Sequence, residues 1–282
     1  MNRTVVLGQL ARDLVLMTGE LPEPGTSADV SRRIETLGGK GANQAVAVAR
    51  LGAPVSLVAV AGDDVVGDQL LAQARADGVD VTAVRRRRGA LTGLIVEILE
   101  PDGRWRYLQH LPSEVLLTPA DVAAAGAVFD GAGAVLLQLQ QPAETVRAAA
   151  RLAAANRALI VLDGAAEEPG ELLALADVVR ADEHEAKLLL GGDVTVDRAR
   201  KLLDRKPRLV AFGVPDGNLF VWDGGDLLLP HGDGPVVDST GAGDAFTAAL
   251  TVALLDGAGP QDAARRAVKA SGKAVGRPGG RP

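Results

Sequence analysis

The residues best suited to do chemistry stand near the carboxyl end, in the run 238–246 (DSTGAGDAF). Gly241 and Gly243 leave backbone amides unobstructed, and the uncharged run 245–255 predicts a buried helix, so these amides are expected at a helix N-terminus that binds an anion. Asp244 falls in the first turn, where its carboxylate can take a proton from a hydroxyl that attacks a bound phosphate. The run therefore indicates phosphoryl transfer.

A plain helix cap fits the same residues, with Asp and Thr before the helix and Gly in a tight turn, and this segment alone does not separate the two interpretations. A second glycine-rich segment, residues 37–45 (LGGKGANQA), favours a ligand site. It leads into a helix expected to run to Leu51, and Lys40 and Asn43 are its ligand-binding candidates. Because Gly41 follows Lys40 where a P-loop requires Ser or Thr, the P-loop interpretation fails.

Together the two segments resemble the two signatures of the ribokinase-type (PfkB) family of carbohydrate kinases, in the same order along the chain. The similarity extends over nearly the whole sequence and is strongest to the ribokinase branch. Further matches are an Asp13 expected at the end of the first strand, the runs 50–53 (RLGA) and 62–67 (GDDVVG), the pair Thr92-Gly93 and the run 117–119 (LTP).

The elements that must position these residues are expected to form a mainly parallel α/β sheet. From residue 134 onward, short apolar runs alternate with helical patterns, such as 159–162 followed by 169–176, and this order is typical of βαβ units. Ligands of such sheets bind beyond the carboxyl ends of the strands. The runs 218–222 and 226–229, joined by the turn 223–225 (DGG), predict an antiparallel edge.

The amino-terminal third reads differently. After a core strand at 5–7, residues 13–36 are rich in Pro, Gly and polar residues and contain only short β-prone pieces, while 94–100 and 104–108 predict a hairpin. The resemblance implies a three-layer ribokinase-like fold over a single domain, residues 1–282, with helices on both faces of the sheet and a small β lid. Its lid strands are expected within 11–36 and 90–112.

The activity implied by the resemblance is that of an ATP-dependent sugar kinase, which transfers the γ-phosphate to a primary hydroxyl of ribose or a related sugar. Asp244 corresponds to the family's catalytic base, and the amides of Gly241, Ala242 and Gly243 would form the anion hole that stabilises charge on the transferring group. Two alternatives remain open: a nucleoside or phosphosugar kinase of the same fold, and a non-catalytic sugar-binding relative.

The run 182–185 (DEHE) occupies the place of the family's NxxE motif, which organises Mg²⁺ and its waters. Asp182 replaces the Asn and is expected to contact nucleotide, and Glu185 is expected to hold Mg²⁺ through a water. A helix N-cap with an acidic first turn explains these residues equally well. Gly213 and Gly217 match a loop that contacts nucleotide, but Ala211 stands where the family usually has a hydroxyl.

A potassium ion is a further cofactor implied by the resemblance, held by Asp238 and Thr240. The three histidines, His110, His184 and His231, lack metal-ligand spacing and are expected to be ordinary polar residues.

The sugar site is the part in which this chain departs most from the ribokinases. Gln140 falls where they carry Glu, and Ala11 falls where they carry Asn. Four further residues match the family's sugar-binding positions: Asp13, Gly39, Lys40 and Asn43. The kinase machinery is therefore expected to be intact around an altered sugar pocket.

Composition excludes several other classes of protein. The net charge of -6, the pI near 5.2 and the aromatic content of 2% argue against a nucleic-acid partner. The chain has no cysteine, and it shows neither a signal peptide nor an apolar run long enough for a membrane span, so a cytoplasmic location is expected. The basic run 85–88 is expected to be a solvated connection. The resemblance also implies a homodimer, because members of the family commonly cover the open edges of their lid strands by pairing.

Overall fold

The computed structural model describes residues 3–102, 104–231 and 241–275. Its centre is an eight-stranded sheet in which six neighbouring strands are parallel and the last two, β13 and β14, are antiparallel. The strand order is β14 (Gly225–Leu229), β13 (Gly217–Trp222), β12 (Leu209–Val214), β11 (Val178–Ala181), β10 (Leu159–Asp163), β9 (Ala132–Gln138), β1 (Arg3–Leu7) and β4 (Val55–Val58). The predicted parallel sheet and its antiparallel edge are confirmed.

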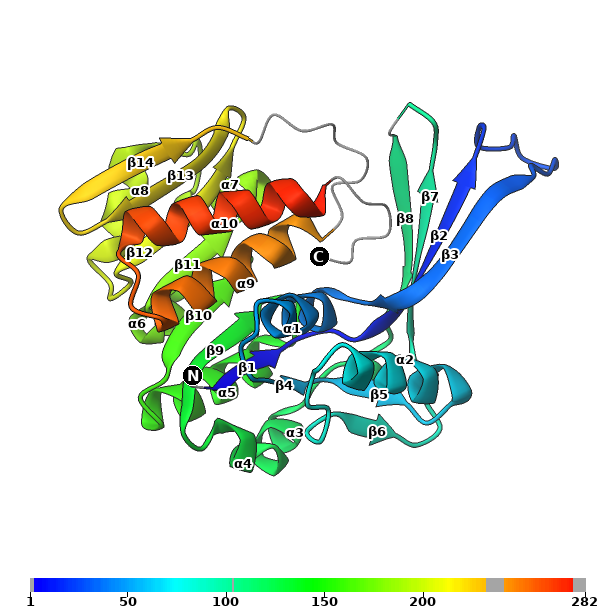
Figure 1. The fold of residues 1–282 in the computed structure, drawn as a ribbon, viewed down its shortest axis with the longest axis horizontal. Helices are drawn as coiled ribbons and strands as arrows, with labels where there is room; N and C mark the ends of the chain where they lie inside the picture. Colours follow the sequence, from blue (N-terminus) through cyan, green and yellow to red (C-terminus); the bar gives the residue numbers. More distant parts are fainter. Residues whose placement is uncertain (1–2, 103, 232–240, 276–282) are drawn as a thin grey trace.

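Helices cover both faces of this sheet, which makes the three layers that Figure 1 shows. One face carries α3 (Pro119–Ala124), α4 (Gly126–Phe129), α5 (Ala143–Ala155), α6 (Gly170–Leu175), α7 (Glu183–Leu190) and α8 (Val196–Leu203). The other carries α1 (Lys40–Arg50), α2 (Val65–Ala76), α9 (Ala242–Leu255) and α10 (Pro260–Ala274). Successive strand residues feed opposite cores: Val5 and Leu7 pack into the first, Val6 into the second. This is why the strands read as continuous apolar runs.

A separate four-stranded sheet projects from the main body (Figure 1). Its order is β3 (Val30–Gly38), β2 (Ala11–Thr18), β7 (Gly93–Leu99) and β8 (Trp105–His110). The pair β2 and β7 is parallel, whereas β2 with β3 and β7 with β8 are antiparallel. The predicted hairpin is therefore present as β7 and β8. The 3₁₀ turn η1 (Ser113–Val115) follows β8 and leads back to the main body.

The amino-terminal prediction was wrong in two respects. Asp13 does not end the first strand: β1 stops at Leu7, and Asp13 is the third residue of β2 in the other sheet. The chain changes sheets at Gly8, where a Cβ would come 2.8 Å from the backbone of Gly41, so only glycine lets the two segments approach. The region expected to hold short β pieces also forms two long paired strands, β2 and β3.

The basic run at 85–88 is not a solvated connection. Residues 85–87 form β6 (Arg85–Arg87), which pairs in parallel with β5 (Val60–Gly62). Arg87 donates to the buried carboxylate of Asp121 at 2.7 Å, and Arg86 donates to the backbone oxygen of Asp64 at 3.1 Å. Nearby carboxylates and carbonyl oxygens thus offset the repulsion between the arginines, so the run can form a strand. The density of charge in the sequence does not predict this.

The two helices of the predicted ligand segments form close to the expected bounds. Helix α1 begins at Lys40 and ends at Arg50, and α9 begins at Ala242, three residues before the uncharged run. Asp244 therefore lies inside the first turn of α9, as predicted. Among the described residues, none of the helices is both long and apolar enough to cross a membrane.

Candidate active site

Many of the predicted site residues that the structure describes converge at the carboxyl ends of the parallel strands. A cavity of about 570 Å³ opens there, between the main body and the four-stranded sheet. The main body lines it with Gln9, Gly39, Lys40, Asn43, Gln140, Arg180, Asp182, Gly241, Gly243 and Asp244. The four-stranded sheet lines it with Asp13, Ile95, Glu97, Trp105, Tyr107 and Gln109. The structure thus brings together both glycine-rich segments, which lie far apart in the sequence.

Asp244 is buried at the bottom of this cavity, with 5% of its surface exposed. Its Oδ1 accepts a hydrogen bond from Nε2 of Gln44 on α1, at 3.1 Å. Burial and the neighbouring carboxylate of Asp163 raise the pKa of Asp244 to about 6, against the opposing effect of Lys40 and Arg180. A carboxyl with this pKa is ionised at neutral pH and basic enough to accept a proton from a hydroxyl.

Asp163, the last residue of β10, organises the floor of the cavity. Its side chain is fully buried and accepts hydrogen bonds from Gln44 Nε2 at 2.7 Å, Arg180 Nη1 at 2.9 Å and Thr247 Oγ1 at 3.2 Å. Burial alone would lower the pKa of Arg180, but Asp163 and the carboxylates of Glu185 and Asp244 outweigh it and hold that pKa above its usual value. The guanidinium therefore carries a fixed positive charge.

Lys40, the first residue of α1, reaches across the cavity toward α7. Its Nζ lies 3.4 Å from Oε1 of Glu185. Burial would lower the pKa of Lys40, yet the carboxylates of Asp163, Glu185 and Asp244 raise it above its usual value. The ammonium group stays charged and can attract a phosphate or a sugar hydroxyl.

Asp182 and Glu185 form a capping box at the start of α7. Oδ1 of Asp182 accepts from the Glu185 amide at 2.8 Å, and Oε2 of Glu185 accepts from the Asp182 amide at 3.0 Å. The helix-cap interpretation of these residues is therefore satisfied in the structure. Asp182 nevertheless lines the cavity, so the cap does not take it out of reach of a ligand.

Asp13 enters the cavity from the four-stranded sheet. Its carboxylate lies so close to the backbone of Gly38 that a Cβ there would come 1.9 Å from its Cγ, which explains why position 38 in the first motif must be glycine. Asn43, on α1, is buried beside the same cavity. Gln140 lies in the turn after β9 and lines the cavity, whereas Ala11 is fully buried in β2 and is outside the described lining.

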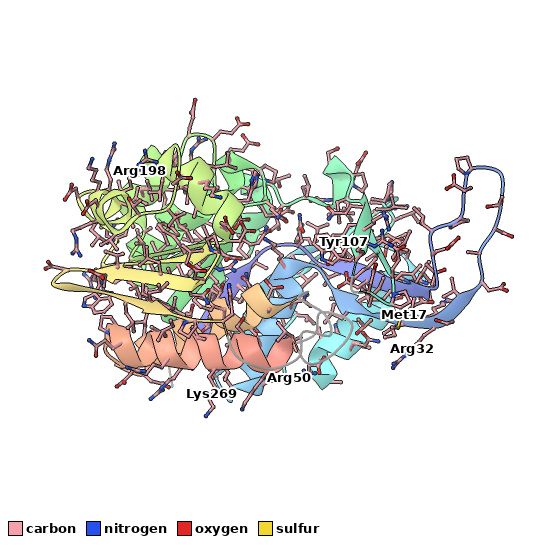
Figure 2. All side chains as sticks on the ribbon, turned by 90° about the horizontal axis from the view of Figure 1, so that it is seen from above. Met17, Arg32, Arg50, Tyr107, Arg198 and Lys269 are labelled. Atoms are coloured by element: carbon pink, nitrogen blue, oxygen red, sulfur yellow. The ribbon has the colours of Figure 1, made fainter. Side chains whose placement is uncertain are left out.

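Side chains of the four-stranded sheet form a wall that sequence reasoning did not assign. Ile95 and Glu97 on β7 and Trp105, Tyr107 and Gln109 on β8 all line the cavity. Within each strand these residues are two positions apart, so they share one face of the sheet, and that face points toward the site. The rings of Trp105 and Tyr107 are 4.7 Å apart, and Figure 2 shows Tyr107 on the side of this sheet that faces the main body.

A second cavity, of about 430 Å³, lies on the other side of the first turn of α9. Its lining includes Gly213 but not Gly217, whose position at the start of β13 is crowded by the backbone of Leu229. Ala211 is fully buried within β12. Three residues line both cavities: Arg180, Asp182 and Gly243. The two cavities therefore meet beside the candidate base.

Metal binding at this site depends on the carboxylates that the chain offers. In the described ranges there is no group of three or more His, Asp or Glu residues arranged to hold a metal ion, and the predicted potassium residues, Asp238 and Thr240, lie outside those ranges. Mg²⁺ in phosphoryl-transfer sites needs only one or two carboxylates, because substrate phosphates and water supply its other ligands. The donor pair Asp182 and Glu185 fits that requirement.

Sequence reasoning missed three residues that build the floor: Gln44, Asp163 and Arg180. A signal for each of them was present in the sequence. Asp163 and Arg180 are polar residues at the ends of apolar strand runs, and the carboxyl ends of neighbouring parallel strands meet at one edge. Gln44 lies one turn after Lys40 on α1, so it shares a helix face with that predicted ligand-binding residue.

Comparison with known proteins decides the family. The model of the pfkB family carbohydrate kinases matches residues 1–282. The chain belongs to this family. Its activity is that of a phosphotransferase acting on a sugar, and both the predicted resemblance and the predicted fold are confirmed.

Individual relatives agree with this assignment. Ribokinase of Bacillus subtilis (strain 168) is 31% identical over 279 residues, covering 98% of this chain and 93% of that protein. The structure of Arabidopsis thaliana ribokinase complexed with ribose and ATP matches this pfkB chain with a TM-score of 0.84 and 27% identity, covering 100% of this chain and 95% of that one. A bifunctional ribokinase/ribose-5-phosphate isomerase A of Fructilactobacillus sanfranciscensis is 29% identical over 263 residues, and this chain spans 49% of its length.

Proposed function

We propose that this pfkB-family chain transfers the γ-phosphate of ATP to a primary hydroxyl of ribose or a closely related sugar. The observation that carries the proposal is the meeting of two cavities at Gly243, beside the buried Asp244. One cavity is lined by carboxylate, amide and ammonium groups suited to a polyol, and the other has room for a nucleotide. An in-line transfer requires this side-by-side arrangement.

In this proposal Asp244 accepts the proton of the attacking hydroxyl, while the amides of Gly241, Ala242 and Gly243 stabilise charge on the phosphoryl group. Lys40 adds a positive charge to the same cavity. When bound, Mg²⁺ would neutralise charge on the ATP phosphates, with Glu185 holding one of its waters and Asp182 facing the nucleotide beside Gly213.

The sugar would lie between Asp13 and the α1 residues Gly39, Lys40 and Asn43, with Gln140 at the rim. The four-stranded sheet would act as its lid. A potassium ion at Asp238 and Thr240 and a nucleotide contact of Gly217 remain parts of the proposal that rest on the family resemblance.

The quaternary structure and location are also proposed. Strands β3 and β8 form open edges of the four-stranded sheet, and apolar side chains such as Leu108 and Val30 are exposed on them. A second copy that covers these edges would remove an aggregation hazard, so we expect a homodimer. The proposed cytoplasmic location rests on the lack of cysteine in the sequence.

A nucleoside kinase is the second candidate, and one observation favours it. Trp105 and Tyr107 line the sugar cavity, and their rings offer a surface on which a planar base could stack. A phosphosugar acceptor would need an additional cation in the pocket. Arg12, which follows Ala11 in β2, does not provide it, because its side chain pairs with Glu35 on the neighbouring strand.

One experiment separates these functions. Purified protein is incubated with ATP, Mg²⁺ and a panel of pentoses, hexoses, phosphosugars and nucleosides, and both ADP release and the phosphorylated product are measured. Ribose or a close relative should give the highest kcat/KM. A nucleoside as the best acceptor would favour the second candidate, and the absence of any phosphorylated product would overturn the kinase proposal.

A further inference from the structure

Arg180 is a buried cation that the mechanism above does not use. It lies near the end of β11, and 14% of its side chain is exposed. It lines the sugar cavity and the nucleotide cavity alike, so its guanidinium lies at the point where a phosphoryl group would cross from one to the other.

Close contacts fix the position of this guanidinium. Nη1 donates to Oδ1 of Asp163 at 2.9 Å, and the group lies 5.7 Å above the ring of Phe246. A Cβ at Gly243 would come 2.7 Å from Nη2, so the guanidinium rests directly against the first turn of α9. Position 243 thus favours glycine for a second reason besides the proposed anion hole, because any side chain there would displace Arg180.

The remaining donors of Arg180 have the right chemistry for a phosphate. A guanidinium offers five N–H groups in a planar fork that matches phosphate oxygens. The bond to Asp163 is the single hydrogen bond that the Arg180 side chain makes within the described part of the chain. A buried cation that served only to neutralise Asp163 would be expected to use more of its donors within the protein.

We propose that the Arg180 guanidinium contacts the γ-phosphoryl group during transfer, and that Asp163 is the positioning residue that holds it there. This inference rests on the proposed function and deepens it. In the transfer, the bond from γ-phosphorus to the ADP oxygen breaks, a bond to the sugar hydroxyl oxygen forms, and the hydroxyl proton passes to Asp244. Arg180 stabilises the negative charge on the equatorial phosphoryl oxygens.

The first test removes the cation with and without its partner. Arg180→Gln should lower kcat by about 100-fold or more, as the loss of an oxyanion donor does in other enzymes. It also leaves Asp163 buried without its charge partner, which can prevent folding. The double variant Arg180→Gln with Asp163→Asn removes one charge of each sign and serves as the folded version. Thermal unfolding of each variant verifies that it is folded.

The double variant discriminates between the two roles. If Arg180 contacts the phosphoryl group, the double variant stays at least about 30-fold below the unmodified protein in kcat, with ribose KM changed less than about 3-fold. If Arg180 only neutralises Asp163, kcat returns to within that 30-fold margin, and the inference is overturned. Arg208→Gln is the matched control, since Arg208 also pairs with an aspartate, Asp177, but away from both cavities.

A binding measurement tests the contact without any acceptor. The affinities for ADP and for the non-hydrolysable analogue AMP-PNP, both with Mg²⁺, are measured by calorimetry on the unmodified protein and the double variant. A γ-phosphate contact predicts that the double variant loses at least about 5-fold in affinity for AMP-PNP relative to ADP, which is about 1 kcal/mol. Arg180→Lys with Asp163 intact should retain part of that preference.

An unchanged ratio of the two affinities would overturn the inference. The same measurement separates the two proposals, because it needs no sugar. If no acceptor in the panel is phosphorylated, the proposed function fails, while the AMP-PNP comparison still decides whether Arg180 contacts the γ-phosphate.

Discussion

Asp163 and Asp244 accept hydrogen bonds from one donor, Nε2 of Gln44, at 2.7 and 3.1 Å. Both carboxylates are buried, and the charge of Asp163 raises the electrostatic cost of ionising Asp244. Arg180 pairs with Asp163, whereas Asp244 is left with the pKa of about 6. The pair therefore separates two roles: Asp163 holds the cation, and Asp244 titrates near neutral pH.

The first prediction is a pH dependence of catalysis. The groups that face Asp244 are Asp163, which raises its pKa, and Lys40 and Arg180, which lower it. A general base must be ionised to work, so kcat/KM should fall about tenfold per pH unit below a midpoint near 6 and level off above it. A pH–rate profile measures this. Asp163→Asn removes the like charge and should move the midpoint to lower pH; a midpoint that stays in place would contradict the assignment.

The second prediction concerns stability. The pKa of Asp244 rises from 3.8 to about 6 on folding, so the ionised carboxyl favours the unfolded chain as pH rises through this range. Asp244→Asn should therefore raise the free energy of unfolding at pH 7 by up to about 3 kcal/mol, and by much less near pH 4. Turnover should fall by about 100-fold or more, because Asn accepts no proton. Urea denaturation at both pH values measures the first effect.

A surface carboxylate provides the control for that prediction. Asp226 is exposed and pairs with Arg200, so Asp226→Asn should change stability by no more than about 1 kcal/mol. Equal stability changes at pH 4 and pH 7 in Asp244→Asn would argue against a buried, titrating Asp244. Turnover above one tenth of the unmodified level would remove Asp244 from the role of base.

The main sheet and helix α9 could be predicted from the sequence because their signals are local. Apolar runs separated by helical patterns specify βαβ units, and the glycines before 245–255 specify a helix N-terminus. The strands of the amino-terminal third were harder to predict from the sequence. The length of β2 and β3 depends on the pairing of β2 with β3 and with β7. Such pairing between distant segments produces no alternation of apolar and polar residues in a strand rich in charged residues, so the sequence does not reveal it.

The floor of the site illustrates a second limit. Asp163 and Arg180 become partners only because β10 and β11 are adjacent and parallel in the sheet. In the sequence, each of them is only a polar residue near the end of an apolar run. Likewise, Trp105 and Tyr107 read as ordinary lid residues until the sheet brings one face of β8 to the cavity. The residue types identify these side chains as candidates, but the strand order and register of the sheets determine which of them lie together in the site.

The third prediction tests the far wall of the sugar pocket. Asp13 lines the cavity from the four-stranded sheet, and a carboxylate there can accept hydrogen bonds from two sugar hydroxyls. Losing two contacts worth about 1 kcal/mol each should raise the sugar KM at least about 10-fold in Asp13→Ala. Steady-state kinetics on the best acceptor measures it. Glu35→Ala, which removes a carboxylate of the same sheet outside the described cavity lining, is the control and should leave KM unchanged. The same KM in both variants would take Asp13 out of the site.

The last prediction concerns the altered rim of that pocket. Gln140 lines the cavity, whereas Ala11 is fully buried outside the described lining, so a change at Gln140 alone should adjust the affinity for ribose. A charged acceptor makes hydrogen bonds worth about 1 kcal/mol more than a neutral one, so Gln140→Glu should lower the ribose KM about 5-fold. Gln140→Ala should raise it, and Gln261→Glu, an exposed position on α10, should have no effect. If neither substitution at Gln140 changes the ribose KM, the sugar is held by other residues, and the departure at this position does not set specificity.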